Sequence, residues 1–209
     1  MEKRRNGSAI KAELFYFKED KMSTRGAWGF FRNGESATKI TYNHMDSYPE
    51  FLGQNVVDFI RNSSIDELNT IFDKIILVDN SEKPTEEQID ECKSFANTDV
   101  STGSLYDWYC LLRNTQGQPE LYKENLRYML DSGKFLKDSL FCEWAYIINL
   151  NTNELEIYRG FRKKPNKKSN RYKILNSENG YYSCEILYTY PLDKIPDNWL
   201  DELIVLLNN

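Results

Sequence analysis

Residues 22–53 constrain the fold more than any other segment, because they contain two strand-like runs joined by a turn signal. Residues 28–31 are aromatic and strand-prone, and residues 37–42 alternate small or polar residues with Ile and Tyr. Between them, Asn33-Gly34 favours a two-residue turn, since both central residues of that turn need a positive φ. We therefore expect an antiparallel hairpin here.

Further elements follow from hydrophobic periodicity, N-capping residues and chain-breaking Gly and Pro. An apolar strand is expected at residues 75–78, and two more hairpins pair residues 144–150 with 154–158 and residues 172–175 with 181–190. Helices are expected at residues 54–61, 64–74, 84–95, from about 104, at 120–130 and at 197–207.

Strands near both ends of the chain, with helices between them, predict an α+β fold. We expect a mixed or antiparallel sheet built from the N- and C-terminal hairpins, with the inserted helices packed on one face. The chain has 209 residues, which is long enough to bury a sizeable core. Residues 22–209 are therefore expected to form a single domain.

Composition excludes several classes of protein. The net charge of −5 argues against general nucleic-acid binding, because such binding depends on neutralising phosphates. No apolar run approaches the roughly 20 residues that cross a bilayer, so no membrane association is expected. The four scattered cysteines and the single histidine indicate neither a disulfide framework nor a metal site, and no cofactor is predicted. A reducing cytoplasm, that of a bacterial host cell, fits best.

A polar loop after the second strand is the first candidate site. It carries Tyr42, His44, Asp46 and Tyr48, and Arg25 lies just before the first strand. A histidine titrates near neutrality, and a carboxylate can orient it or raise its pKa. Catalysis by His44 and Asp46, ligand binding by all five residues, and structural capping are the alternatives.

The segment also resembles a family of uncharacterised phage and prophage proteins. Such proteins open with Met-(Gly/Ser)-Thr-Arg and carry Tyr-x-His-x-Asp-x-Tyr-Pro at the end of the first hairpin, which residues 22–25 and 42–49 match here. The likeness extends to Asp107-Trp108-Tyr109-Cys110 and Glu143-Trp144-Ala145-Tyr146. The resemblance implies a mobile-element origin and no established chemistry.

Members of this family begin at the equivalent of Met22. We therefore predict that residues 1–21 are a leader outside the domain. Residues 18–21 can be encoded by a purine-rich stretch that would serve as a ribosome-binding sequence ahead of Met22. The alternative is that residues 14–17 form an edge strand.

Removal of Met22 would expose Ser23 beside a free α-amine, as in N-terminal-nucleophile hydrolases. Asn43 and Asp46 follow on the second strand and loop, as a polar pair does in those enzymes. Relatives with Gly at this position would lack the nucleophile. The alternative is structural, with Arg25 paired to Asp46.

The third candidate is a basic segment in an otherwise acidic chain, spanning residues 159–173. It would bind an anion or a partner, or else form a solvated loop. The candidate binding residues within it are Arg162, Lys163, Lys164, Lys167 and Lys168.

These features together favour a non-enzymatic accessory protein of a phage or other mobile element. Its expected partner is a host protein or a small anionic ligand, and its expected role is to inhibit host defence. The alternatives are an N-terminal-nucleophile-like amide hydrolase and a nucleotide- or phosphate-binding regulator.

Overall fold

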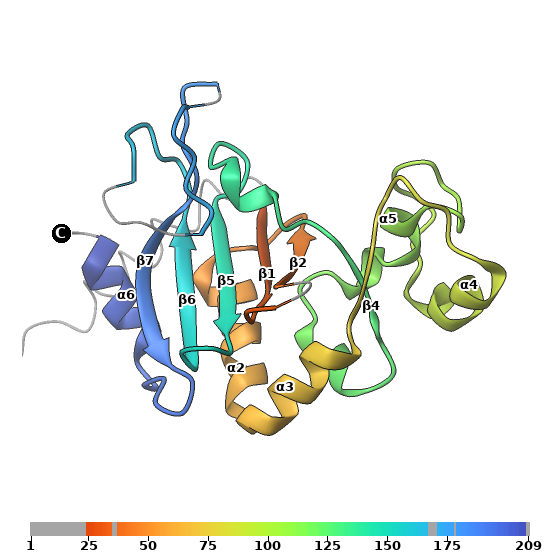
Figure 1. Cartoon of the computed structure of the whole chain (residues 1–209), viewed down its shortest axis with the longest axis horizontal. Coiled ribbons are helices and arrows are strands. Elements are labelled where there is room, and N and C mark those ends of the chain that lie inside the picture. Colours follow the sequence, from red (N-terminus) through yellow and green to blue (C-terminus); the bar gives the residue numbers. More distant parts are fainter. Residues whose placement is uncertain (1–23, 35–36, 167–170, 178, 208–209) are drawn as a thin grey trace, which may run out of the picture.

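Two hairpins from opposite ends of the chain meet in one sheet, because strand β1 of the first pairs in parallel with strand β5 of the second. The computed structural model describes residues 24–34, 37–166, 171–177 and 179–207. The strand order is β2-β1-β5-β6-β7, and the other three pairings are antiparallel (Figure 1). The predicted α+β fold is confirmed. These strands are β1 (Gly26–Phe31), β2 (Thr38–Asn43), β5 (Trp144–Asn149), β6 (Glu154–Arg159) and β7 (Glu185–Pro191).

The first hairpin forms where predicted, but its connection is longer than a two-residue turn. The backbone N–H of Arg32 donates to the carbonyl oxygen of Ala37 over 2.9 Å, which leaves residues 33–36 between the last bonded positions. Gly34 has a φ of 120°, a conformation that glycine adopts without steric cost. Asn33 and Gly34 therefore do not form the predicted two-residue turn.

The helices begin close to where their capping residues predict. The hydroxyl of Ser64 accepts from the backbone N–H of Glu67, and the Glu67 carboxylate accepts from the N–H of Ser64. Thr85 and Gln88 form the same reciprocal cap on the next helix. The helices are α2 (Gln54–Arg61), α3 (Ile65–Lys74), α4 (Glu86–Cys92), α5 (Trp108–Leu111) and α6 (Trp199–Leu207).

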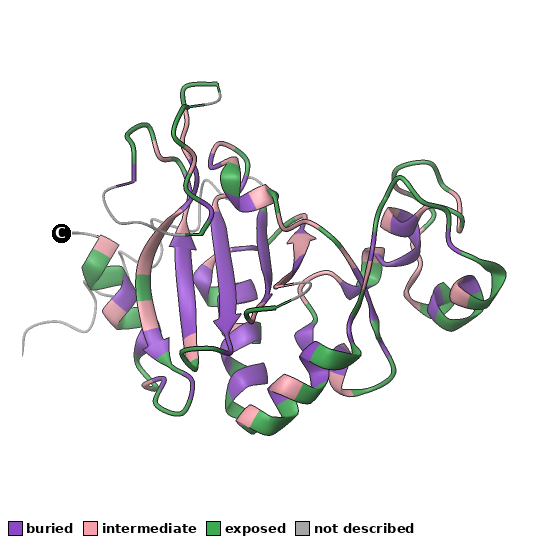
Figure 2. Cartoon of the chain, in the orientation of Figure 1, coloured by how far each residue is buried: buried purple, intermediate pink, exposed green. Residues whose placement is uncertain are grey.

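Helices α2, α3 and α6 pack on one face of the sheet and build the larger core. The three central strands β1, β5 and β6 are almost fully buried, whereas the edge strand β7 is partly exposed (Figure 2). Trp28 and Phe30 of β1 pack with Phe59 of α2 at ring separations of 6.1 and 6.2 Å. Nε1–H of Trp199 donates to Oε1 of Gln54 over 3.1 Å, which joins α6 to α2.

The expected helix at residues 120–130 is wrong. A 3₁₀ turn, η4 (Pro119–Lys123), is followed instead by strand β4 (Tyr128–Leu130), which pairs in parallel with β3 (Ile76–Val78). These two strands form a small second sheet beside the main one. Helices α4 and α5 lie on the same side of the molecule (Figure 1). Pairing with β3 and burial of Tyr128 and Met129 outweigh the local helical pattern.

The expected strand at residues 172–175 is also absent from the described structure, although its partner persists as β7. Arg171 instead binds this segment to the face of the sheet opposite α2, α3 and α6. Its Nη2–H donates to Oε1 of Glu156 over 2.7 Å, and a second bond joins Nη1 to Oε2. Asn149 and the Tyr158 hydroxyl also donate to the Glu156 carboxylate, over 2.7 and 2.8 Å. Residues 171–177 therefore add no strand to the sheet.

The Arg171–Glu156 pair predicts a large effect on stability. Glu156 is 4% exposed, so Glu156→Gln would leave the Arg171 guanidinium without its carboxylate partner. We expect a loss of about 2–3 kcal/mol in the free energy of unfolding, measured by chemical denaturation. Glu154→Gln on the same strand is the control and should cost less than about 0.5 kcal/mol. Equal losses in the two variants would contradict this role.

Candidate functional site

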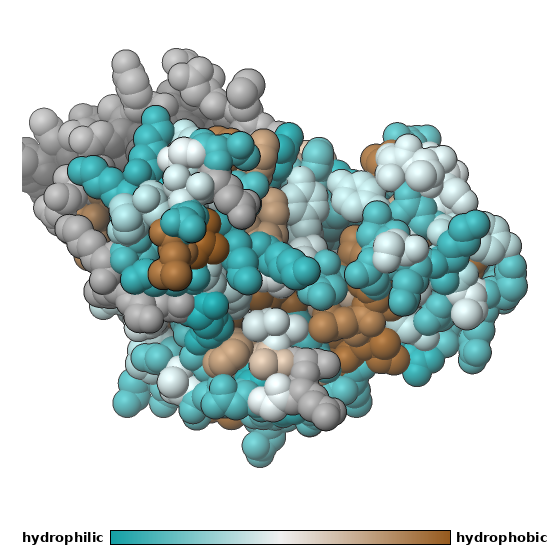
Figure 3. Space-filling view, turned by 45° about the horizontal axis from the view of Figure 1, so that its top comes forward, coloured by the Kyte–Doolittle hydropathy of each residue, from teal (hydrophilic) through white to brown (hydrophobic). Residues whose placement is uncertain are grey.

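Polar and charged side chains gather at one end of the main sheet. Strands β1 and β5 begin there, and β2 and β6 end there, at the top of Figure 1. Arg25, His44, Glu143 and Arg159 therefore stand at neighbouring strand ends. With this end turned forward, hydrophilic residues cover most of the visible surface, interrupted by separate hydrophobic patches (Figure 3).

His44 contacts residues from a distant segment of the chain. Its Nδ1 and the Tyr42 hydroxyl form a hydrogen bond of 3.0 Å, and its backbone N–H donates to Oε1 of Gln116 over 3.0 Å. The same Gln116 oxygen accepts from Nη1–H of Arg113 over 2.8 Å. The rings of Tyr42 and Tyr109 lie 6.5 Å apart. Three rings, those of Tyr42, His44 and Tyr109, thus lie close together with the Arg113 guanidinium nearby.

The charges around His44 are positive. Burial lowers the pKa of the His44 imidazole below its usual range, and the guanidinium groups of Arg113 and Arg25 lower it further. The shift is opposite in direction to the one that a paired Asp46 carboxylate would produce. Burial raises the pKa of Tyr42, while both arginines act against that rise. His44 is therefore a neutral hydrogen-bonding group at neutral pH.

Arg25 is exposed at the start of β1 and is held by its backbone. Its N–H donates to Oε1 of Glu143 over 3.3 Å, and the N–H of Glu143 donates to the carbonyl oxygen of Arg25 over 3.0 Å. The guanidinium carbon lies 5.6 Å from the centre of the Phe141 ring. Within the described part of the chain, neither Arg25 nor Arg113 forms an ion pair with an acid.

The loop that follows His44 is held by buried polar groups. The amide of Asn43 donates to the Ser47 hydroxyl over 2.8 Å and to the carbonyl oxygen of Met45 over 2.5 Å. The Tyr146 hydroxyl donates to the carbonyl oxygen of Ser47 over 3.1 Å. Asp46 is exposed with a φ of 56°, a conformation that Asp tolerates better than most residues. Asn43 therefore positions the loop.

Two predicted members of the site have other surroundings. Tyr48 packs against the larger core at the start of the π-helical turn η1 (Pro49–Gly53). No ion pair joins Arg25 to Asp46 among the described residues, so the expected pairing is not made. Tyr42 and His44 thus lie near enough to Arg25 for its charge to affect both of them. Asp46 does not take the part in this group that the sequence predicts.

The hydrolase alternative depends on a residue that lies outside the described part of the chain. Ser23 is one such residue, as are residues 1–21 of the predicted leader. Thr24 is 1% exposed, and its hydroxyl has no hydrogen-bond partner in the described structure. Asn43 is engaged by Ser47 and Met45. Of the groups that the hydrolase hypothesis needs, the described residues therefore include the loop after His44 but not the nucleophile.

The basic segment is divided among separate contacts. Arg162 forms an ion pair with Glu185, and Nζ of Lys163 lies 5.6 Å from the centre of the Tyr181 ring. Lys164 is exposed. Lys167 and Lys168 lie outside the described residues. Together with the Arg171–Glu156 pair, these contacts show that part of the segment holds the fold.

Sequence reasoning missed Arg113, Tyr109 and Gln116. They lie more than 60 residues after His44: Tyr109 on α5, Arg113 on the 3₁₀ turn η3 (Arg113–Thr115), and Gln116 directly after that turn. Gln116 contacts His44, and Tyr109 contacts Tyr42, only because the segment folds back against the end of β2. The resemblance marked Tyr109 within a longer motif, but no local pattern links it to the hairpin loop.

Comparisons with family models, curated proteins and solved structures returned no significant match. Among the described residues, no group of three or more His, Cys, Asp or Glu could hold a metal ion. No helix in the described part of the chain is long and apolar enough to cross a membrane. The function must therefore be argued from the site itself.

The single histidine makes the electrostatics of this site measurable. We expect the His44 imidazole to titrate below the ordinary value of about 6.5, as followed by proton NMR. Arg113→Gln should raise that pKa, because it removes a cation that disfavours the imidazolium. Lys83→Gln, an exposed change between β3 and α4, is the control for net charge. A pKa equal in parent and Arg113→Gln would contradict the assigned electrostatics.

Proposed function

We propose that this chain is a non-enzymatic accessory protein of a phage or other mobile element that binds an anionic group beside the first hairpin. The observation that carries the proposal is the position of Arg25 and Arg113. Both act on His44 and Tyr42, and neither forms an ion pair with an acid among the described residues. A phosphate or carboxylate placed between them would supply the missing negative charge.

The neighbouring groups suit binding of a planar anion. The Tyr42 hydroxyl and Nδ1 of His44 are bonded to each other over 3.0 Å, which fixes the orientation of both rings. Tyr42 contacts both Tyr109 and Phe135, with ring centres 6.5 and 5.1 Å away. Aromatic rings beside a cationic edge favour a ligand that combines negative charge with a planar group. A small phosphorylated compound, or an acidic group of a host protein, has this chemistry.

A non-enzymatic role is supported by how the loop uses its polar groups. Asn43 and Ser47 bond to each other and to backbone atoms, so they shape the loop. The mobile-element role and inhibition of host defence rest on the resemblance described above, and are part of the proposal for that reason alone.

Adenosine monophosphate and inorganic phosphate are suitable calorimetric probes, because the first adds a planar base to the charge of the second. The parent should bind adenosine monophosphate more tightly than phosphate. The double variant Arg25→Gln/Arg113→Gln should weaken binding by about 100-fold, since each arginine supplies a charge-assisted hydrogen bond.

The control is Lys83→Gln/Lys194→Gln, which changes net charge equally at two exposed positions and should leave affinity unchanged. Failure of the parent to bind either probe at millimolar concentration would contradict the anion-binding proposal. So would equal affinity in the two double variants.

A further inference from the structure

Arg159, at the end of β6, has an unusual environment for a cation. Its guanidinium carbon lies 4.4 Å from the centre of the Trp144 ring on the neighbouring strand. It forms no hydrogen bond and no ion pair with any residue that the structure describes. Burial lowers the pKa of Arg159, although the nearby Tyr146 and Glu143 act in the opposite direction. A half-buried guanidinium normally has an acidic or carbonyl partner.

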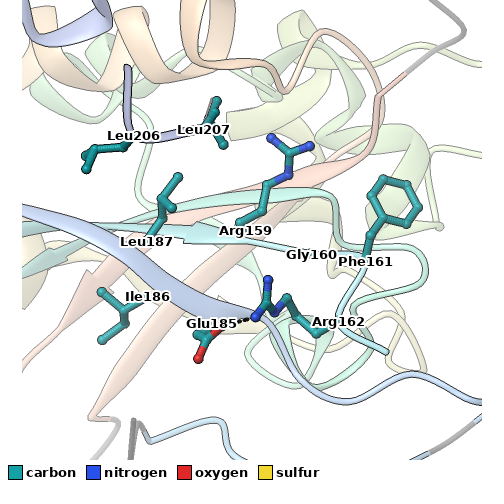
Figure 4. Close-up of a pocket in the computed structure, with 9 residues that line it drawn as sticks. All are labelled: Arg159, Gly160, Phe161, Arg162, Glu185, Ile186, Leu187, Leu206 and Leu207. Atoms are coloured by element: carbon teal, nitrogen blue, oxygen red, sulfur yellow. Dashed lines mark ion pairs between the residues drawn. The ribbon is translucent and has the colours of Figure 1, made fainter. Parts of the chain in front are cut away.

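Arg159 also lines a cavity of about 390 Å³ (Figure 4). Leu187 of β7 and Leu206 and Leu207 of α6 lie on one side of its side chain, and Phe161 lies on the other. Arg162 also lines the cavity, but it is engaged with Glu185, as the dashed line in Figure 4 shows. The cavity therefore presents an apolar wall and one cation that forms no ion pair with a described residue.

Local backbone geometry shapes the mouth of this cavity. Gly160 passes so close to Cys142 that a Cβ there would lie 2.0 Å from the Cys142 carbonyl oxygen. The N–H of Phe161 donates to the carbonyl oxygen of Ser139 over 2.7 Å, and Phe161 has a φ of 56°. Phe161 is 47% exposed as a result. Any larger residue at position 160 would displace this turn.

We propose that this cavity binds a monocarboxylate with an aliphatic tail, the carboxylate on Arg159 and the tail against the leucines. The planar guanidinium matches a carboxylate with two parallel hydrogen bonds. One available cation favours a single negative charge, and the leucine wall favours an apolar tail over a second polar group. The inference is independent of the site at His44, which uses different arginines and a different class of probe.

The carboxylate has two possible sources: a free fatty acid, or the C-terminus of a peptide that ends in an apolar residue. Octanoate represents the first source, and N-acetyl-Gly-Gly-Leu with a free carboxylate represents the second. Calorimetry on the full chain should show binding of at least one of them. Octylamine, acetate and the amidated peptide should not bind, because each lacks either the charge or the tail. Binding of octanoate alone identifies a free acid, and binding of the peptide alone identifies a C-terminus.

Arg159→Met tests the role of the cation, because Met retains an apolar contact with Trp144 and removes the charge. Affinity should fall at least tenfold, as expected for the loss of a charge-assisted interaction of about 1.5–3 kcal/mol. Lys194→Met, an exposed change between β7 and α6, should leave affinity unchanged. The melting temperature of Arg159→Met should be close to that of the parent, because Met keeps an apolar contact with Trp144 and no ion pair is lost.

A second variant keeps the test decisive if Arg159→Met does not fold. Leu206 is 39% exposed, so Leu206→Glu is compatible with folding and places a negative charge beside the ligand tail. It should abolish binding of octanoate and of the peptide acid. The proposal is overturned if the parent binds neither acid, or if the folded Arg159 or Leu206 variant binds as tightly as the parent.

Discussion

Parallel pairing of β1 with β5 is the constraint on which the rest of the structure depends. Parallel neighbours cannot be joined by a tight turn, so the chain needs a long connection between them. Helices α2 to α5 and the small sheet form that connection. The same pairing aligns the start of both strands, and so brings Arg25 beside Glu143. Residues far apart in the sequence become neighbours at one end of the sheet.

The arginines of this chain fall into two groups with different consequences. Arg171 and Arg162 are neutralised by Glu156 and Glu185, and their contacts hold the long segment after β6. Arg25, Arg113 and Arg159 have no acidic ion-pair partner in the described structure. The lack of an ion pair at these three arginines is the observation on which both binding proposals rest.

Sequence reasoning succeeded where local signals agree with tertiary structure. The first and second hairpins, the bounds of α2 and the Ser64 cap of α3 all follow from turn residues, caps and periodicity. Residues 120–130 have a helical pattern, yet pairing with β3 makes part of them a strand. Residues 172–175 look strand-like, yet Arg171 binds Glu156 of β6 and the segment forms no strand. In both cases a distant partner decides the outcome.

The candidate site shows the same limit. Tyr42 and His44 were identifiable because they lie together in one motif. Arg113 and Gln116 were not, because no local pattern encodes their return to the end of β2. The basic composition of residues 159–173 suggested one binding surface, whereas ion pairs with Glu156 and Glu185 divide it. Net composition does not reveal which charges are neutralised.

Locating a bound anion tests the central claim most directly. Crystals of the protein soaked in tungstate, a heavy analogue of phosphate, would show the anion by anomalous diffraction. We predict a peak within hydrogen-bonding distance of both Arg25 and Arg113, next to His44. Peaks confined to exposed lysines, with none between these two arginines, would contradict it.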